Sequence, residues 1–219
     1  MEALTLFFMI KLAAFEDETS RGARYILPTL KKCNIWTGAA AAGFSTWLDM
    51  LPRSYHGVIM WSEEQLRHIS DHRAASRMRA MSKDFAAISD KMLQLLSGAP
   101  PAARASMPLL QLPRSRLEAL FKAATCIIQS RSFGEFRLVP VLDMFNYSPH
   151  SNLAPTWREN VDGFTGYVVA ADRDYDAGEE VQLFYGPKGN HNLIEMYGFA
   201  LFDNPFNCAM MYVHLPFPQ

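Results

Sequence analysis

The chain has 219 residues, 49% of them hydrophobic, and a formal net charge of −1. This length and composition suffice for one packed domain, or for one domain with a helical insert. Because the charges are balanced and no long basic run occurs, the sequence lacks the electrostatic signature of a nucleic-acid-binding protein.

The N-terminal run MEALTLFFMIKLAAF is apolar but lacks the features of a signal peptide. It carries Glu2 in place of a basic residue, and Lys11 interrupts an apolar run that is too short to span a bilayer. We therefore expect a buried helix over 3–15, a polar link over 16–24 and a short helix over 25–32. Since no targeting or membrane segment is visible, we expect an intracellular protein that does not bind membranes. The cytoplasm and nucleus are favoured, and an organelle stays open.

A helix start is marked at Ser62. Gln65, three residues later, completes the capping-box pattern, in which each side chain bonds to the other residue's backbone N–H. Trp61 and Leu66 stand at the positions of a hydrophobic staple. The pattern predicts a helix N-terminus and says nothing about chemistry.

Apolar residues then recur at spacings of three and four, the pattern of one face of a long helix. They are Met78, Met81, Phe85, Ile88, Met92 and Leu95. We interpret this stripe as core rather than as a binding groove, because Met commonly fills irregular cores. The helix should end at 98–101, where Gly and Pro begin a Pro-rich connector over 98–113.

A second amphipathic helix is predicted after the connector and should stop near 131–134. Its apolar face consists of Leu117, Leu120, Phe121, Ala124, Ile127 and Ile128.

Beyond this helix the pattern changes to that of short strands and turns. An apolar run over 138–145 predicts a short buried strand or turn. Val161-Asp162-Gly163 is a hairpin-turn signal that should join strands near 153–160 and 164–171.

The C-terminal part continues this pattern. A turn at 175–178 precedes an alternating strand over 181–185. Asn190 is a candidate N-cap for a helix that ends before Gly198, and 208–215 resembles a final strand. Helices thus fill the front half and small β units the back half, which predicts an α+β fold with its strands in a separate layer.

The cysteines Cys33, Cys126 and Cys208 are far apart and form no CxxC pair. We therefore expect buried free thiols and no structural zinc site. His150 and His191 are conceivable metal ligands, but ligands normally cluster with supporting carboxylates, so no metal is predicted.

Three segments of the back half resemble the C-terminal half of SET domains: DMFNYSP, ADRDYDAGEEVQLFYGPKGN and EMYGFALFDNPFN. They look like the subgroup typified by the plant Rubisco large-subunit lysine methyltransferase. The runs ALTLFF, LPRSYHGVIMWSEEQL and IIQSRSF resemble that subgroup's helical insert and its flanks. The resemblance implies a helical flanking and insert region over 1–130 and the C-terminal part of a SET domain, built of short strands, over 131–215.

The activity that this resemblance implies is transfer of a methyl group from S-adenosylmethionine to a lysine side chain of a protein. The Cys-rich flanks of many histone-directed SET enzymes are absent, which favours a non-histone target. The sulfonium methyl must meet the amine in line, so positioning supplies much of the rate. The amine must be neutral to attack, and a nearby sulfonium and a desolvating channel both lower the pKa of lysine. Aromatic walls tolerate ammonium through cation–π attraction.

Tyr185, within LFYG, matches the family's catalytic tyrosine residue for residue. Asn146 matches the Asn of the family's Asn-His motif, which contacts the cofactor, and Tyr147 stands where that motif has His. Taken alone, a Tyr that ends a strand is usually a core residue and an Asn before Ser-Pro a turn residue. The matched motifs reverse that preference for Tyr185 and Asn146, and the resemblance places Tyr147 with Asn146 in the cofactor-binding site.

The resemblance also implies a substrate pocket lined by Phe133, Phe184 and Tyr197. A histidine-methylating branch of the subgroup carries a polar residue at the position of Phe133, so the apolar ring favours lysine as the target.

A function of a different class is also open. Tyr147 departs from the family motif, the Gly-rich strand and turn that grip the cofactor do not occur in this sequence, and the helical substrate-binding lobe expected after Phe206 does not follow. The alternative is an inactive SET fold that serves as a structural or binding subunit. A partner protein would then cover its exposed sheet edge and apolar surface.

Overall fold

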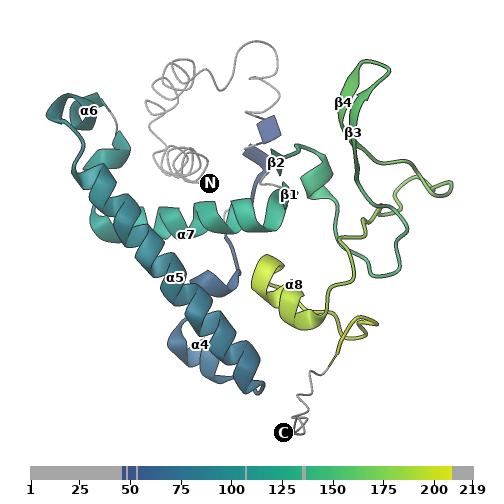
Figure 1. The fold of residues 1–219 in the computed structure, drawn as a ribbon, viewed down its shortest axis with the longest axis horizontal. Coiled ribbons are helices and arrows are strands. Elements are labelled where there is room, and N and C mark those ends of the chain that lie inside the picture. Colours follow the sequence, from purple (N-terminus) through teal and green to yellow (C-terminus); the bar gives the residue numbers. More distant parts are fainter. Residues whose placement is uncertain (1–45, 48, 53, 107, 135–136, 209–219) are drawn as a thin grey trace, which may run out of the picture. The chain divides into compact units, whose positions relative to one another are not determined.

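The computed structural model describes residues 46–47, 49–52, 54–106, 108–134 and 137–208 (Figure 1). Its contacts divide the chain into two compact units: Met1–Met144 with Glu195–Gly198, and Phe145–Ile194 with Phe199–Gln219. The helices predicted at 3–15 and 25–32, and the strand at 208–215 apart from Cys208, lie outside the described residues. The boundary at 130/131 that the resemblance implies stays a prediction.

The first unit is mainly helical. Its elements are η1 (Val58–Met60), α4 (Glu63–Arg67), α5 (His72–Ser97), α6 (Pro101–Ser106), η2 (Pro108–Gln111), α7 (Arg114–Arg131), β1 (Ser132–Phe133), β2 (Arg137–Leu138) and η3 (Leu142–Met144).

The predicted capping box is confirmed at the start of α4. The Ser62 hydroxyl accepts from the Gln65 backbone N–H at 3.2 Å, and the Gln65 side chain accepts from the Ser62 N–H at 2.8 Å. At the next helix, the Asp71 carboxylate accepts from the N–H groups of Arg73 and Ala74. Each of these side chains satisfies donors that the first helical turn leaves without an intrahelical partner.

Helix α5 ends at Ser97 with Gly98 as its C-cap, as the sequence predicts. Met78 and Met92 are buried, which confirms their place in the core. The prediction is wrong for Ile88 and Leu95, whose residues are 43% and 62% exposed. A 26-residue helix turns its stripe gradually away from a fixed neighbour, so a spacing of three and four does not bury every member.

Figure 1 shows α5 crossing α7, the two helices are in contact, and the main core of the first unit includes residues of both. The predicted apolar face of α7 is confirmed by the burial of all its members except Leu117, which is half-buried. Fully burying one such side chain contributes roughly 1.5–3 kcal/mol. The core cluster consists of Trp47, Leu51, Met92, Leu109, Leu120, Phe121, Ala124, Ile127 and Ile128.

The region predicted as a plain connector, 98–113, contains α6 and η2. Pro101 and Pro108 stand at the first position of these two elements, where a missing N–H costs nothing. Proline therefore starts short helical turns here instead of preventing them, and Leu109 of η2 is 3% exposed.

The apolar run 138–145 forms a turn that leads into η3, as one of the two predicted alternatives had it. Its polar residue, Asp143, has a side chain with 0% exposure. Trp47 Nε1 donates to Asp143 Oδ1 at 2.9 Å, and Arg131 Nη1 donates to Asp143 Oδ2 at 3.0 Å. The buried carboxylate is thus paired with a cation and hydrogen-bonded, as burial of a charge requires.

The second unit carries the hairpin of β3 (Thr156–Val161) and β4 (Phe164–Val168). The strands are antiparallel, with Trp157 opposite Tyr167 and those two rings packed edge to face at 5.1 Å. Asp162 and Gly163 have φ of 52° and 76°, which confirms the predicted turn. Such a turn requires positive φ, and Asp-Gly supplies it at low cost.

The strand predicted over 181–185 is wrong in its extent. The described residues there contain one isolated parallel bridge, between Tyr147 and Leu183. Two hydrogen bonds make it: Leu183 N–H donates to Asn146 O at 2.8 Å, and Ser148 N–H donates to Leu183 O at 3.0 Å. Alternating residues set which side chains face inward, but a strand also needs a neighbour along its whole length.

Helix α8 (Asn190–Tyr197) begins in the second unit and ends in the first. Asn190 does not act as its N-cap, which corrects the prediction. Asn190 is the first helical residue, and its backbone N–H donates to Asn207 Oδ1 at 2.8 Å. The end before Gly198 is confirmed, and Gly198 has a φ of 80°.

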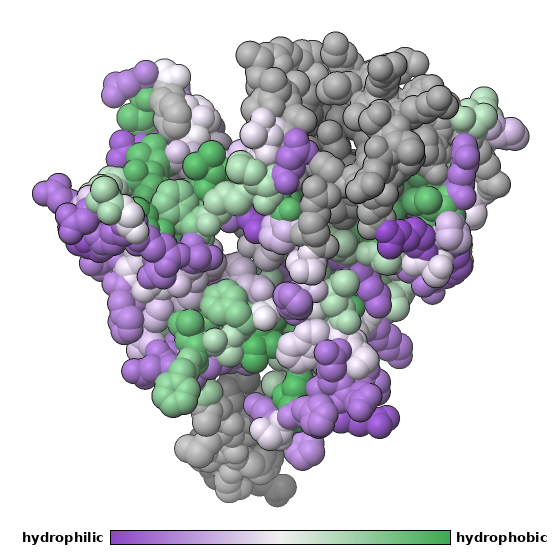
Figure 2. Space-filling view, turned by 180° about the vertical axis from the view of Figure 1, so that it is seen from behind, coloured by the Kyte–Doolittle hydropathy of each residue, from purple (hydrophilic) through white to green (hydrophobic). Residues whose placement is uncertain are grey.

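On the face drawn in Figure 2, hydrophobic residues form small groups interrupted by hydrophilic and neutral ones. None of the described helices is both long and apolar enough to cross a membrane. Cys126 and Cys208 are free thiols. Cys126 is buried as predicted, whereas Cys208 is exposed, contrary to prediction.

Candidate functional site

Tyr185 lies two residues beyond the bridge at Leu183 and directly before Gly186. Its hydroxyl donates a hydrogen bond to the backbone carbonyl of Phe145. Gly186 has a φ of 99°, a conformation open to glycine and strained for other residues, so the chain turns sharply after the tyrosine. The phenol is thus held between two segments that are forty residues apart in sequence.

Tyr147 packs against Tyr185, with ring centroids 5.2 Å apart and planes inclined by 33°. It is 6% exposed, and its hydroxyl donates to the Gly186 carbonyl at 3.3 Å. Burial raises the pKa of the Tyr147 phenol, and a backbone hydrogen bond from Lys188 offsets part of that rise. The hydroxyl therefore keeps its proton near neutral pH and acts as a donor.

Phe184 belongs to the same group of rings. Its centroid is 6.4 Å from that of Tyr147 and 5.7 Å from that of Phe206. Its backbone N–H donates to Leu153 O at 2.7 Å, which fixes the chain just before Tyr185. Aromatic faces carry partial negative charge and therefore attract a cationic amine, and their apolar surface also accommodates the neutral amine.

Asn146 precedes Tyr147 and is exposed, with its amide Nδ2 2.6 Å from Glu180 Oε1. Gln182 Nε2 donates to the other oxygen of that carboxylate at 3.0 Å. The carbonyl of Asn146 belongs to the bridge with Leu183, so its backbone is fixed while its side chain remains at the surface.

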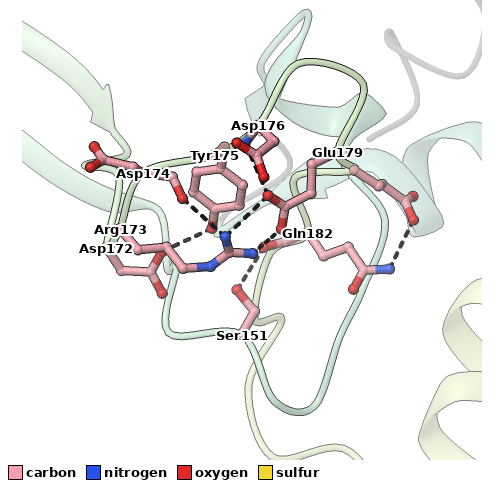
Figure 3. Close-up of polar contacts among 9 residues, drawn as sticks. Ser151, Asp172, Arg173, Asp174, Tyr175, Asp176, Glu179 and Gln182 are labelled. Atoms are coloured by element: carbon pink, nitrogen blue, oxygen red, sulfur yellow. Dashed lines mark hydrogen bonds and ion pairs between the residues drawn. The ribbon is translucent and has the colours of Figure 1, made fainter.

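The loop before this segment is held by Arg173 (Figure 3). Its guanidinium pairs with Glu179, donates to the Asp174 carbonyl at 3.0 Å and lies 4.1 Å from the centre of the Tyr175 ring. The pairing lowers the pKa of Glu179. Ser151 closes the loop by donating to Gln182 O at 2.6 Å. These contacts lead the chain to Leu183 in a defined conformation.

Sequence reasoning missed two contributors. Phe199 completes the aromatic group, with its centroid 6.3 Å from that of Tyr147. Asn204, only 7% exposed, donates to Lys188 O and to Asn190 Oδ1, both at 2.9 Å. It thereby ties the chain just after Tyr185 to the start of α8. An Asn before Pro normally indicates a turn, so its burial had no visible sequence signal.

Two predicted pocket residues belong to the first unit. Phe133 is the second residue of β1, and Tyr197 is the last residue of α8. The end of α8 is anchored within that unit, where Arg77 pairs with Glu195 through two bonds of 2.6 Å. Phe184 lies in the second unit. The assignment of Phe133, Phe184 and Tyr197 to one substrate pocket stays a prediction.

No protein-family model matches the chain. Among curated proteins it is similar to the ribosomal lysine N-methyltransferase set11 of Schizosaccharomyces pombe, with 38% identity over 68 residues, which are 31% of this chain and 16% of that protein. It is also similar to human SET domain-containing protein 4, with 33% identity over 72 residues, 33% of this chain and 16% of that protein. The matched segments thus span about a sixth of each relative's length.

Solved structures of Rubisco LSMT share the fold. The SET domain of LSMT bound to lysine and AdoHcy superimposes with a TM-score of 0.54 at 21% identity, over 72% of this chain and 37% of that chain. Rubisco LSMT bound to sinefungin and monomethyllysine gives a TM-score of 0.52 at 22% identity, over 72% of this chain and 35% of that chain. The predicted α+β, SET-type fold is confirmed, and so is the resemblance to SET-domain lysine methyltransferases.

Proposed function

We propose that this chain carries a SET-type fold that acts as a protein-lysine methyltransferase and uses S-adenosylmethionine. The observation that carries the proposal is the packing of Phe184, Tyr185 and Phe199 around the ring of Tyr147, directly after Asn146 in sequence, within a SET-type fold. The similarity to set11, a protein named as a ribosomal lysine N-methyltransferase, supports the same activity.

Tyr185 is the proposed catalytic residue. The substrate lysine must present a neutral amine along one line, and a hydroxyl at the end of an aromatic channel can orient that amine. The ring of Tyr147 packs against Tyr185, and Phe184 packs against Tyr147, so these rings supply apolar walls near the phenol. Such walls desolvate the lysine and lower its pKa, while their faces still tolerate the methylated ammonium product.

The donor set of the second unit fits S-adenosylmethionine. Bound there, the group would supply an activated methyl on a sulfonium. The Asn146 amide is exposed, has both donor and acceptor capacity, and would bind the polar part of the cofactor, with Tyr147 beside it. To do so, Asn146 must share or exchange its contact with Glu180. No metal is needed for this chemistry.

We propose a non-histone protein as the substrate, in an intracellular compartment. The similar protein set11 carries the name ribosomal lysine N-methyltransferase, and the similar structures are of Rubisco LSMT. These names support a non-histone target as a class.

A second candidate function is binding without catalysis. The Asn146 amide is bound to Glu180, and Tyr147 replaces the histidine of the family motif. An inactive SET fold with these features would serve as a structural or binding subunit for a partner protein.

Calorimetric titration of the purified chain with S-adenosylmethionine tests the proposal. We expect micromolar binding that Asn146→Ala weakens about tenfold or more, because the variant loses a hydrogen-bonding side chain. Asn152→Ala, another exposed asparagine of the second unit, is the matched control and should bind normally. Absence of binding by the folded chain would favour the binding-subunit candidate.

Methyl transfer is then measured with radiolabelled cofactor on a histone-depleted protein extract and, separately, on purified histones. Tyr185→Phe should lower the rate by about 10²–10⁴-fold, as expected for loss of a positioned catalytic hydroxyl. Tyr175→Phe, whose hydroxyl contacts Asp172, is the control. Full activity of Tyr185→Phe would contradict the assigned role, and labelling confined to histones would contradict the substrate class.

A further inference from the structure

Tyr147 contacts three residues of the segment that carries Tyr185. Its backbone forms the parallel bridge with Leu183, its ring packs on Tyr185, and its hydroxyl donates to the carbonyl of Gly186. One residue thus fixes the chain before, at and after the proposed catalytic tyrosine.

The Tyr185 hydroxyl is held by the same short segment, residues 145–147. It donates to Phe145 O, two residues before Tyr147, while Leu183 N–H donates to Asn146 O at 2.8 Å. Any shift of the Tyr147 backbone would therefore move both the acceptor of the phenol and the residues that carry it. The two segments behave as one clamp around Tyr185.

The turn at Gly186 explains why a hydroxyl is useful at position 147. Gly186 has a φ of 99°, and no atom lies within 4 Å of the place where its Cβ would be. The turn is therefore not confined by packing on that side. A part-buried hydrogen bond of 3.3 Å from the Tyr147 hydroxyl to the Gly186 carbonyl restrains the turn instead.

We propose that the Tyr147 side chain is a positioning residue that sets the orientation of Tyr185 by holding the turn at Gly186. This role rests on the proposed methyltransferase function and goes beyond the cofactor contact implied for Asn146 and Tyr147. On this proposal, Tyr147 stands in place of the family histidine because its hydroxyl holds the turn after Tyr185. The replacement is then compatible with activity.

The test is Tyr147→Phe, which keeps the packed ring and removes only the hydroxyl, with its bond to the Gly186 carbonyl and the one it accepts from the Lys188 backbone. Loss of one hydrogen bond that orients a reacting group should lower kcat about five- to tenfold. The Kd for S-adenosylmethionine and the KM for the protein substrate should stay within about twofold, because the clamp acts on the orientation of Tyr185 and not on binding. Tyr175→Phe serves as the control and should leave all three constants unchanged.

A second measurement does not depend on activity. Hydrogen–deuterium exchange followed by mass spectrometry should show faster uptake over residues 183–189 in Tyr147→Phe than in the unaltered chain, with unchanged uptake over the β3–β4 hairpin. Unchanged exchange at 183–189 would overturn the inference, and so would a higher KM with unchanged kcat. If the unaltered chain transfers no methyl group, the proposed function fails, and the exchange experiment still decides whether Tyr147 holds the turn.

Discussion

Among single residues, one buried carboxylate in the described part of the first unit ties together side chains that are far apart in sequence. Asp143 is paired with Arg131 and accepts from the indole of Trp47, which is 1% exposed. The Arg131 guanidinium also donates to the Asp143 backbone carbonyl at 3.0 Å. Asp143 therefore joins the end of α7, the start of the described chain and the η3 turn within one hydrogen-bonded group.

Removing the cation alone should be costly. Arg131→Met keeps most of the apolar stem but leaves the Asp143 carboxylate buried without its partner, so we expect a loss of about 3–5 kcal/mol in the free energy of unfolding. Urea denaturation followed by circular dichroism measures the change. Arg114→Met, which removes an exposed arginine from the other end of α7, is the control and should cost far less, because solvent screens its ion pairs. An equal effect of both changes would contradict the importance of the buried pair.

At the scale of elements, the end of α8 is set by a glycine. Gly198 has a φ of 80°, and a Cβ there would lie 2.7 Å from the His56 carbonyl oxygen. Both the backbone conformation and the space therefore exclude a side chain. In the same helix, Glu195 accepts two bonds from Arg77, and its carbonyl accepts from Gln129 at 3.1 Å.

Gly198→Ala should therefore destabilise the chain by more than the conformational cost of positive φ, which is about 1–2 kcal/mol. The matched control is Gly178→Ala, since Gly178 has a φ of 89° with nothing within 4 Å of its added Cβ. That variant should show only the conformational cost. The denaturation midpoints of the two variants measure the difference. Equal midpoints would contradict the prediction, because they would mean that the backbone at His56 moves away from the added Cβ at no cost.

The elements differ in how far the sequence predicts them. Local signals suffice for the Ser62 capping box, the turn at Asp162-Gly163 and the end of α8 at Gly198, because each depends on residues close in sequence. The cap of α8 was missed because Asn207, seventeen residues further on, supplies it. The strand at 181–185 was overestimated because its pairing depends on a distant segment.

In the candidate site, too, contacts between residues distant in sequence are the part that the sequence does not predict. The identities of Tyr185, Asn146 and Phe184 come from a matched motif, which carries information that periodicity lacks. Their contacts could not be predicted, because the carbonyl that receives the Tyr185 hydrogen bond and the ring of Phe199 come from separate parts of the chain. Sequence therefore predicts which residues matter here better than it predicts how they are held.

At the scale of the whole molecule, stability should depend on pH in the alkaline range. Burial raises the pKa of the Cys126 thiol from 9.0 to about 11, and it also raises the pKa of Tyr147 from 10.0. A raised pKa in the folded state means that the folded chain keeps a proton that the unfolded chain has released. The stabilising contribution is therefore complete below pH 9.0 and is lost as pH rises towards 11.

We expect the free energy of unfolding to fall by about 2–3 kcal/mol from the Cys126 contribution across that range. Urea denaturation between pH 8 and pH 11 measures the slope. Cys126→Ala should flatten it, whereas Cys208→Ala, which removes an exposed thiol, should leave it unchanged. A slope that is the same with and without Cys126 would contradict the buried-thiol account.

The two contact units are not consecutive in sequence, because Glu195–Gly198 is grouped with the first unit while the chain on either side belongs to the second. The chain therefore passes from one unit to the other three times, and no single cleavage yields one fragment per unit. A gene truncated to begin at Phe145 would encode Glu195 without Arg77 and Gln129, the partners that hold it. The complementary fragment would keep that arginine and glutamine and lose their shared acceptor. The effect of a deletion in this region therefore includes the loss of the hydrogen bonds between Glu195 and its two partners, in addition to the loss of the deleted residues.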